Sequence, residues 1–375
     1  MLKFLRGAFK VQAIFLISLF LTPNRPALSL EGRTPVEYAA TFTVEREDGR
    51  IILTIREPWP GAEESLHYVL VNRGEDPGEI PQDAVLIEVP VRTCASTTTV
   101  NLAFMEELGV LPSLVGQGGK RYVYDPPPGF ENVPEIGSGT ELDLEKILEL
   151  SPEVIFAYAY SPAERELFRR LEEMGIHVVL MSEYLERTPL GRTEWIKYLS
   201  CFFCKEAEAG RIFEEVRRRY EELASLGRSQ ARKPGILCNI PFSGIWYLPG
   251  GQNWSAALLE DAGADYPWSG TLSEGSLGLD LEKVFEEAGD AHIWIHPGDC
   301  RTMEDLRRID ERFALFRAFR DGEVYNNTRR MSHSGGNDYH QRGVLRPDQI
   351  LEDLISILHP SLMPEHELRY YRKLK

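Results

Sequence analysis

Two cysteines, Cys201 and Cys204, have the two-residue spacing of thiol redox motifs. They lie inside a long helical pattern rather than at a helix start, where the helix dipole would lower a thiol pKa, so the sequence favours helix packing. With Cys94, Cys238 and Cys300 the cysteines number five, an odd total and a low density for an exported chain that relies on disulfides. A thiol oxidoreductase acting through Cys201 and Cys204 stays open as an alternative.

Three residues that could bind a metal ion, His333, Asp338 and His340, crowd one Gly-rich segment, and His296 could join them. A bare-ion site of this kind would leave the aromatic side chains of the loops unexplained. The His-Pro-Gly-Asp-Cys run at His296 also lacks the second ligand pair of a closed zinc site. The sequence contains no nucleophile with a matching base and no phosphate-binding loop. We therefore predict no catalytic residues, no metal site and no cofactor, and a protein that is not an enzyme.

The elements that must position these residues alternate between short apolar strands and amphipathic helices from Val85 onward. This alternation predicts a parallel α/β sheet, and it occurs in two sets. Before it, residues 30–83 predict a small β-rich extension with Asp48-Gly49 as a hairpin turn. Between the sets, residues 191–230 predict one long connecting helix, with two shorter helices broken at Gly210 as the alternative.

A five-residue sequence occurs once in each set. Leu142-Asp143-Leu144-Glu145-Lys146 recurs as Leu279-Asp280-Leu281-Glu282-Lys283, and each copy precedes a predicted buried strand. Each Asp suits a helix N-cap, and each Glu falls in the first turn, where the helix dipole favours negative charge. Capping alone explains either copy by itself, but two copies at equivalent points favour a duplicated lobe with a paired function.

The composition excludes a broad nucleic-acid-binding face, because 58 Asp and Glu against 42 Lys and Arg give a net charge of −16. At the N-terminus, Lys3, Arg6 and Lys10 precede an apolar run of about 11 residues and Ala27-Leu28-Ser29. This pattern predicts a signal peptide over residues 1–29 that is cleaved near Ser29, and hence a periplasmic protein. A membrane anchor is the alternative, but the run is shorter than the ~20 residues that span a bilayer.

Over roughly residues 84–360 the chain resembles the substrate-binding proteins of ABC-type importers for iron complexes and cobalamin. The residues that carry the resemblance are the repeated Leu-Asp-Leu-Glu-Lys, the connecting helix, and the tail from Gly336-Asn337-Asp338-Tyr339 to His359-Pro360. The resemblance implies two α/β lobes, over residues 84–190 and 231–375, joined by one rigid helix over 191–230. It also implies that Glu145 and Glu282 dock into arginine pockets of the transmembrane permease subunits.

Ligands of the family sit between the lobes, where loops follow the strands. Flat aromatic rings in such loops suit a planar macrocycle or an aromatic chelate, since each stacked ring adds ~0.5–1.5 kcal/mol beyond its area. Each candidate has a plainer role in packing or capping. The predicted ligand-binding residues are Ser96, Thr97, Thr98, Tyr122, Tyr124, Tyr158, Tyr160, Trp246, Tyr247, Trp254, His296, Asn337 and Tyr339.

The function that this resemblance implies is capture of an iron chelate, a siderophore or haem-like compound, and its delivery to an ABC importer by a monomer. Cobalamin or a bare metal ion, carried by a protein of the same class, is the alternative. Some cobalamin binders have an aromatic residue six positions before each docking glutamate, whereas this chain has Gly139 and Ser276 there, which favours an iron complex.

Overall fold

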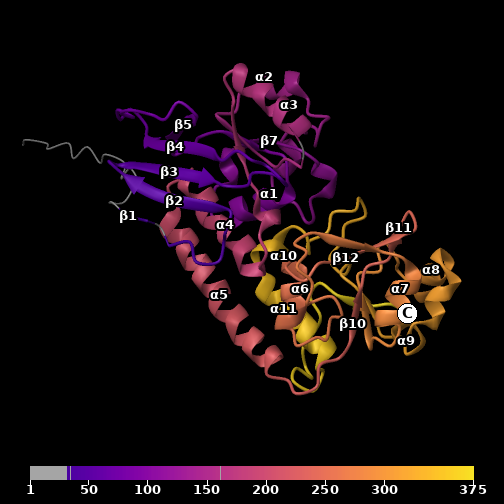
Figure 1. Ribbon diagram of the computed structural model, residues 1–375. Helices are drawn as coiled ribbons and strands as arrows, with labels where there is room; N and C mark the ends of the chain where they lie inside the picture. The colour runs from indigo at the N-terminus through magenta and orange to yellow at the C-terminus, as the bar shows by residue number, and fades with distance from the viewer. Residues whose placement is uncertain (1–31, 34, 161) are drawn as a thin grey trace, which may run out of the picture.

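The computed structural model describes residues 32–375 apart from residues 34 and 161 (Figure 1). It has the predicted α/β class, with parallel sheets in two lobes. Within the described residues, no helix is both long enough and apolar enough to cross a membrane. The predicted signal peptide, residues 1–29, and its cleavage near Ser29 lie outside this part of the chain.

The N-terminal strands form a five-stranded sheet in the order β1-β2-β3-β4-β5. Its strands are β1 (Gly32–Arg33), β2 (Phe42–Glu47), β3 (Arg50–Ile55), β4 (Leu66–Asn72) and β5 (Ala84–Val89). The predicted turn between β2 and β3 is present: Asp48 and Gly49 have φ values of 49° and 76°, as a two-residue hairpin requires. All pairs are antiparallel except β4 with β5, which are parallel.

The position of β5 corrects the expected boundary at residue 84. This strand pairs with β4 in the N-terminal sheet and not with the strands of the first lobe. An apolar run predicts a buried strand, but it does not say which of two sheets the strand joins.

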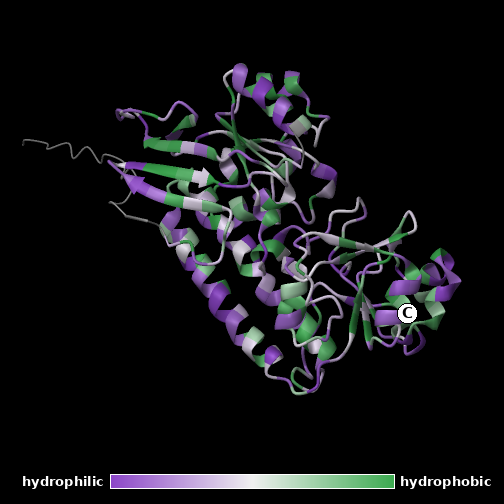
Figure 2. Cartoon of the chain, in the orientation of Figure 1, coloured by the Kyte–Doolittle hydropathy of each residue, from purple (hydrophilic) through white to green (hydrophobic). Residues whose placement is uncertain are grey.

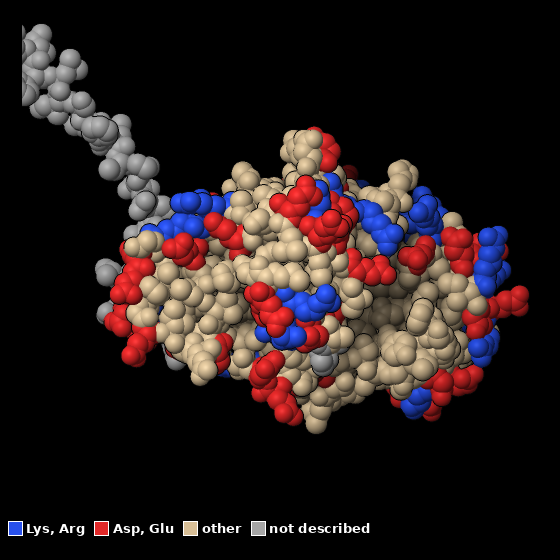
Figure 3. All heavy atoms as spheres, turned by 90° about the horizontal axis from the view of Figure 1, so that it is seen from above, with Lys and Arg blue, Asp and Glu red and all other residues tan. Residues whose placement is uncertain are grey.

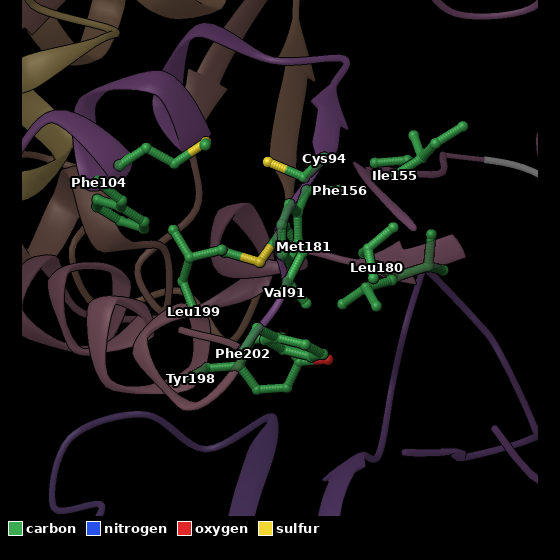
Figure 4. Packing of buried hydrophobic residues seen from close by; sticks show 14 of the residues in the cluster. Val91, Cys94, Phe104, Ile155, Phe156, Leu180, Met181, Tyr198, Leu199 and Phe202 are labelled. Carbon is green, nitrogen blue, oxygen red and sulfur yellow. The ribbon is translucent and has the colours of Figure 1, made fainter. Parts of the chain in front are cut away.

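The five-stranded sheet also shares one hydrophobic core with the first lobe, so it is not a separate unit. The Tyr68 hydroxyl of β4 accepts a hydrogen bond from the Leu180 N–H at 3.2 Å and donates to the Val178 carbonyl at 3.3 Å. The buried Glu194 carboxylate accepts the N–H groups of residues 37–39. Figure 4 shows the centre of this core, where Val91, Phe156 and Phe202 pack together.

The sheet of the first lobe is parallel and has the order β7-β6-β8-β9. Its strands are β6 (Cys94–Ser96), β7 (Leu114–Gln117), β8 (Val154–Ala157) and β9 (His177–Leu180). Its helices are α1 (Thr99–Glu107), α2 (Leu144–Leu150) and α3 (Pro162–Glu173), and α2 begins after Asp143, the predicted N-cap.

Two helices, not one, connect the lobes: α4 (Pro189–Cys201) and α5 (Glu206–Arg228). The single helix expected over 191–230 is therefore wrong, and the break lies at residues 202–205 rather than at Gly210, which is inside α5. Cys204 has a φ of 54°, and the Lys205 N–H donates to the Ser200 carbonyl at 3.0 Å, which ends α4 as a Schellman motif does. No Gly or Pro marks this stop.

Both connecting helices pack into both cores. In α4, Leu190 belongs to the core of the second lobe and Leu199 to that of the first. In α5, Phe213 belongs to the first core and Tyr220 to the second. The α5 helix runs along the outside of the molecule beside both lobes (Figure 1), and its buried residues recur every three or four positions between hydrophilic ones (Figure 2).

The second lobe has a sheet in the order β10-β14-β15-β16, parallel except at β16, and a small antiparallel sheet of β11, β12 and β13. The strands are β10 (Ile236–Cys238), β11 (Pro241–Phe242), β12 (Ile245–Pro249), β13 (Ser276–Leu279), β14 (Ile293–Ile295), β15 (Val324–Asn326) and β16 (Arg372–Lys373). The helices are α6 (Trp254–Asp261), α7 (Leu281–Ala288), α8 (Met303–Ile309), α9 (Arg317–Arg320), α10 (Arg342–Leu345) and α11 (Pro347–Leu358).

Candidate functional site: a cavity where the strands end

A cavity of about 510 Å³ lies at the carboxyl ends of the parallel strands of the second lobe. Four predicted ligand-binding residues line it together: Trp254, His296, Asn337 and Tyr339. Ligand sites of open α/β sheets form at these strand ends. Figure 3 shows the molecule from above, with a hollow whose walls are mostly neither basic nor acidic. The lining residues are Asn239, Pro249, Asn253, Trp254, Ser255, Ser276, His296, Gly298, Asp299, Asn326, Asn327, Thr328, Met331, Gly335, Asn337, Tyr339 and His340.

The cavity wall is polar but nearly uncharged. Five asparagine amides and two imidazoles line it, and Asp299 is its one acidic residue. Such a wall offers donors and acceptors in several directions together with the flat face of Trp254. The wall therefore suits a bulky ligand with many polar atoms better than a small ion.

Strained backbone places two side chains of this wall. Asn239 and His296 directly follow the neighbouring strands β10 and β14, and their φ values are 65° and 58°. Positive φ is costly for residues other than glycine and clusters at ligand sites. His296 Nε2 lies 2.8 Å from the Tyr371 hydroxyl, and the two rings stack at 5.5 Å. Burial lowers the pKa of His296 to about 3, so its imidazole is neutral at physiological pH.

The first lobe contributes tyrosines from its own strand ends. Tyr158 and Tyr160 follow β8, with ring centroids 5.0 Å apart, and Tyr184 follows β9, with its ring 4.7 Å from that of Tyr160. Tyr160 is 57% exposed although it belongs to this ring cluster. The cluster is an accessible aromatic surface of the kind predicted for stacking on a ligand.

Arg192 and Glu183, which sequence reasoning missed, lie between the two lobes. The Arg192 guanidinium of α4 covers the Trp254 ring of the second lobe at 4.5 Å, and its Nη2 lies 3.9 Å from the Glu183 carboxylate. Burial raises the pKa of Glu183 to about 7 and lowers that of Arg192. Glu183 lies in a short turn and Arg192 near the start of α4, and the sequence of neither segment contains a recognisable motif.

Four predicted ligand-binding residues, Ser96, Thr98, Trp246 and Tyr247, do not line the cavity. Trp246 is fully buried in the second core, where its ring packs against Trp294 and Phe313, so it is not a cavity residue. The sequence around Trp246 does not indicate which face of the strand its side chain occupies, and in the structure that face is the core. Tyr247, the next residue, is exposed but does not line the cavity.

Ser96 and Thr98 have roles at the start of α1. Ser96 is buried, and its hydroxyl donates to the Thr98 carbonyl at 3.1 Å. Thr98 caps α1 by accepting the Asn101 N–H at 3.1 Å.

Thr97 and the pair Tyr122 and Tyr124 also lie apart from this cavity. The Thr97 hydroxyl is buried without a hydrogen-bond partner among the described residues. The Tyr124 N–H donates to Gln341 Oε1 at 2.8 Å, and Arg330 covers its ring at 5.0 Å. Tyr124 thus belongs to a contact between the lobes, whereas Tyr122 is an exposed side chain.

The proposed bare-ion ligands do not converge. Asp338 is buried between Arg330, at 2.6 Å, and Arg342, at 3.2 Å, while His333 is exposed on its loop. Within the described ranges, no three His, Cys, Asp or Glu side chains are grouped so that they could hold a metal ion. His296 and His340 still reach the cavity wall as single imidazoles.

The cysteines give no support to thiol chemistry. Cys201 is fully buried at the end of α4, and burial raises its pKa well above the usual range. Burial also raises the pKa of Cys204 to about 11. A redox thiol needs a lowered pKa, so neither sulfur is activated.

The two copies of Leu-Asp-Leu-Glu-Lys form matching helix starts. Asp143 accepts the Lys146 N–H at 2.9 Å in α2, and Asp280 accepts the Lys283 N–H at 2.7 Å in α7. Glu145 and Glu282 are exposed in the two first turns, and Glu282 is paired with Arg312 at 3.0 Å. The repeat therefore gives each lobe an exposed carboxylate in the same local frame.

Known proteins match this chain over most of its length. The family model described as "Periplasmic binding protein" matches residues 94–329. The chain belongs to the periplasmic binding protein family. An uncharacterized lipoprotein of Methanocaldococcus jannaschii is 26% identical over 301 residues, which cover 77% of this chain and 70% of the relative. The family and the solved neighbours are described as binding proteins.

Two solved structures share the fold. A possible iron-binding (periplasmic solute-binding) protein of Staphylococcus epidermidis has a TM-score of 0.57 at 15% identity, covering 72% of this chain and 99% of its own. A periplasmic heme binding protein of Pseudomonas aeruginosa has a TM-score of 0.55 at 18% identity, covering 72% and 94%. At these identities the likeness concerns the fold.

Proposed function

We propose that the protein binds a metal chelate, an iron siderophore or a haem-like compound, between its lobes and delivers it to the permease subunits of an ABC importer. The observation that supports this most is the cavity of about 510 Å³, lined by amides, imidazoles and Trp254 at the strand ends. Its size and mixed wall fit a bulky ligand. The iron-binding and heme-binding descriptions of the two solved neighbours support the same ligand class.

The alternatives have less support. A bare-ion carrier would need converging ligands, and Asp338 is already engaged by two arginines. A thiol oxidoreductase would need an activated sulfur, and the pKa values of Cys201 and Cys204 are raised. Cobalamin remains the alternative within the chelate class, because its bulk also suits a cavity lined with amides.

Titration of the purified protein with haemin, ferric siderophores, cobalamin and free divalent metals, followed by calorimetry, tests the proposal. We expect saturable 1:1 binding of an iron chelate. Replacing Trp254 with Ala removes a stacking face and should weaken binding about tenfold. Tyr247→Ala, an exposed aromatic outside the cavity, is the matched control and should bind normally. Saturable binding of a free ion alone, or of no chelate, would contradict the proposal.

A further inference from the structure

A pocket of about 690 Å³ lies at the opposite edge of the second lobe's sheet from the cavity. His292 and Glu323, which line the pocket, directly precede β14 and β15. His296 and Asn327, which line the cavity, directly follow the same two strands. Because β14 and β15 are parallel, the pocket and the cavity lie at opposite ends of the sheet. The pocket is therefore separate from the site proposed for the chelate.

The imidazole of His292 meets more hydrogen-bond donors than it can accept. The Gly235 N–H donates to His292 Nδ1 at 3.2 Å, and His292 Nε2 lies 3.2 Å from Arg317 Nη1. A neutral imidazole has one acceptor nitrogen and one N–H, and a guanidinium has donors only. Because Nδ1 accepts from the backbone, the ring proton is on Nε2, and two N–H groups face each other. Both donors call for an acceptor from outside the chain.

Two arginines bring positive charge to this ring. Arg317 Nε pairs with Asp321 at 3.2 Å, and within the described residues its Nη1 has no neighbour of the acceptor type except the ring of His292. Arg232 is exposed and forms no ion pair with the described part of the chain. Burial and the positive charges of Arg317 and Arg232 lower the pKa of His292, so both guanidinium groups act on the imidazole. The pocket thus presents one ring N–H and two guanidinium groups.

The acidic residues of the pocket do not cancel this charge. Glu323 is engaged by Lys373 Nζ at 2.6 Å and by the Tyr325 hydroxyl at 2.9 Å. Asp321 accepts from Nε of Arg317 and not from its Nη1. With Lys373 paired to Glu323 and Arg317 paired to Asp321, the positive charge of Arg232 is unbalanced among the lining residues. The pocket is therefore cationic in a chain that carries −16 overall.

We propose that this pocket binds a phosphate-type oxyanion, with His292 Nε2–H and Arg317 Nη1 as donors and Arg232 as a further positive charge. A tetrahedral oxyanion presents several acceptor oxygens, so one group can accept from a ring N–H and a guanidinium together. A neutral ligand would leave the charge of Arg232 unbalanced, and a cation would be repelled by it. A free phosphate or sulfate ion and the phosphate of a lipid headgroup share this chemistry. The site goes beyond the proposed function and does not depend on it.

Protonation of His292 should strengthen the site. An anion beside the ring favours the charged imidazole, so binding raises the pKa of His292 and takes up a proton. The affinity for sulfate, which keeps its charge, should therefore rise as the pH falls from about 7 to about 5. His359, the other imidazole of the pocket, has its Nε2 3.3 Å from the Gly263 carbonyl and so already has an acceptor. The other charged or titratable groups around the ring are Arg232, Arg317, Lys373, Asp290, Asp321, Glu323 and Tyr325.

NMR titration of the protein with sodium sulfate tests the inference at the Gly235 amide, whose hydrogen bond ends on the ring of His292. The wild type should show saturable binding at one site. Arg317→Gln should weaken this binding about tenfold. Asp321→Asn removes the acceptor that competes for Arg317 and should tighten binding about twofold or more. Arg320→Gln, a change to an exposed arginine of the same helix outside the pocket lining, is the control and should leave the affinity unchanged.

The pH profile is a second measurement with its own control. The sulfate affinity of the wild type should rise from about pH 7 to about pH 5. His292→Gln, which keeps an acceptor for the Gly235 N–H, should flatten this profile, whereas His359→Gln should retain it. A flat profile in the wild type would contradict the role given to His292.

Two further arms distinguish the source of the oxyanion. Inorganic phosphate is titrated in solution, and vesicles of phosphatidylcholine with and without phosphatidic acid are tested for retention of the protein. Binding of the ions alone assigns a free oxyanion, whereas retention on phosphatidic acid vesicles that Arg317→Gln removes assigns a headgroup. No response of the Gly235 amide to either ion together with no retention, or an Arg317→Gln variant that keeps the wild-type affinity, overturns the inference. Neither result bears on binding of the chelate in the cavity.

Discussion

At the scale of single residues, the cavity depends on side chains held in unusual states. His296 combines a positive φ, a stacked tyrosine and a neutral imidazole. Trp254 and His340 line both the large cavity and the narrow space of about 20 Å³ that Arg192 also lines. Such positions cost stability and persist because the surrounding core fixes them.

The depressed pKa of His296 predicts a loss of stability in acid. Below pH ~6.5 the unfolded chain protonates this imidazole, while the folded protein, with a pKa of about 3, does not. Its contribution is fully present above pH ~6.5 and falls by about 2 kcal/mol between pH 7 and pH 5. His296→Gln, which keeps a partner for Tyr371, should remove this share of the pH dependence of the unfolding free energy.

Urea unfolding at the two pH values measures this effect. His333→Gln, a change at an exposed loop residue, is the control and should leave the pH dependence intact. An equal pH dependence in the wild type and in His296→Gln would show that His296 titrates normally in the folded protein.

The sequence pattern predicted four of the residues that line the cavity. Trp254, His296, Asn337 and Tyr339 were predicted because they follow strands in loops or begin a helix, and the structure brings them together. Trp246 was misplaced because a strand residue next to a loop carries no mark of the face it turns to. Arg192 meets Trp254 only through the packing of α4 against α6, and it meets Glu183 through the turn that precedes α4, so no local spacing records the group.

At the scale of elements, the spacing of apolar residues and the capping residues predicted the helices best. For example, α2 and α7 begin at the predicted caps Asp143 and Asp280. Pairing partners were less predictable. The β5 strand joined the N-terminal sheet, and the break after α4 depends on a non-glycine residue in the left-handed region, Cys204. Both depend on tertiary contacts that outweigh local preference.

The matched helix starts predict a transport phenotype without a binding phenotype. Glu145→Lys or Glu282→Lys reverses an exposed charge in a first turn, outside the cavity lining, and should reduce uptake of the chelate at least about tenfold if each carboxylate pairs with an arginine of the permease. Glu149→Lys and Glu286→Lys, on the same helices, are the controls. Uptake by the reconstituted importer and calorimetry of the free protein separate the two effects.

A fall in chelate affinity equal to the fall in uptake would place these glutamates in ligand binding instead. Undiminished uptake by both charge-reversed variants would remove them from docking altogether.

At the scale of the whole molecule, a polar contact joins the lobes beside the cavity. Asp338 of the C-terminal tail, buried, pairs with Arg330 and Arg342, and Arg342 continues to Glu106 of α1 at 2.9 Å. Together with α4 and α5, which enter both cores, this contact ties the two lobes at several points.

Asp338→Asn should be costly because it leaves two arginines facing a neutral amide. Breaking a buried ion pair costs about 3–5 kcal/mol, so we expect the unfolding free energy to fall by about 3 kcal/mol. Asp321→Asn breaks an exposed pair with Arg317 and should cost less than about 1 kcal/mol. Chemical denaturation measures both, and equal effects would show that the pairing of Asp338 contributes no more than a surface contact.

Because the N-terminal sheet and the first lobe share one core, shortening the chain before residue 94 would expose apolar residues of that core. The family match begins at residue 94 and stops at residue 329. Tyr68, which precedes it, forms hydrogen bonds with the backbone of the edge strand β9. Asn337 and His340, which follow it, line the cavity. A gene trimmed to residues 94–329 would encode a protein whose first core lacks the N-terminal sheet and whose cavity lacks the lining residues after 329. The part of the chain that packs as one unit is therefore longer than the part that the family model matches.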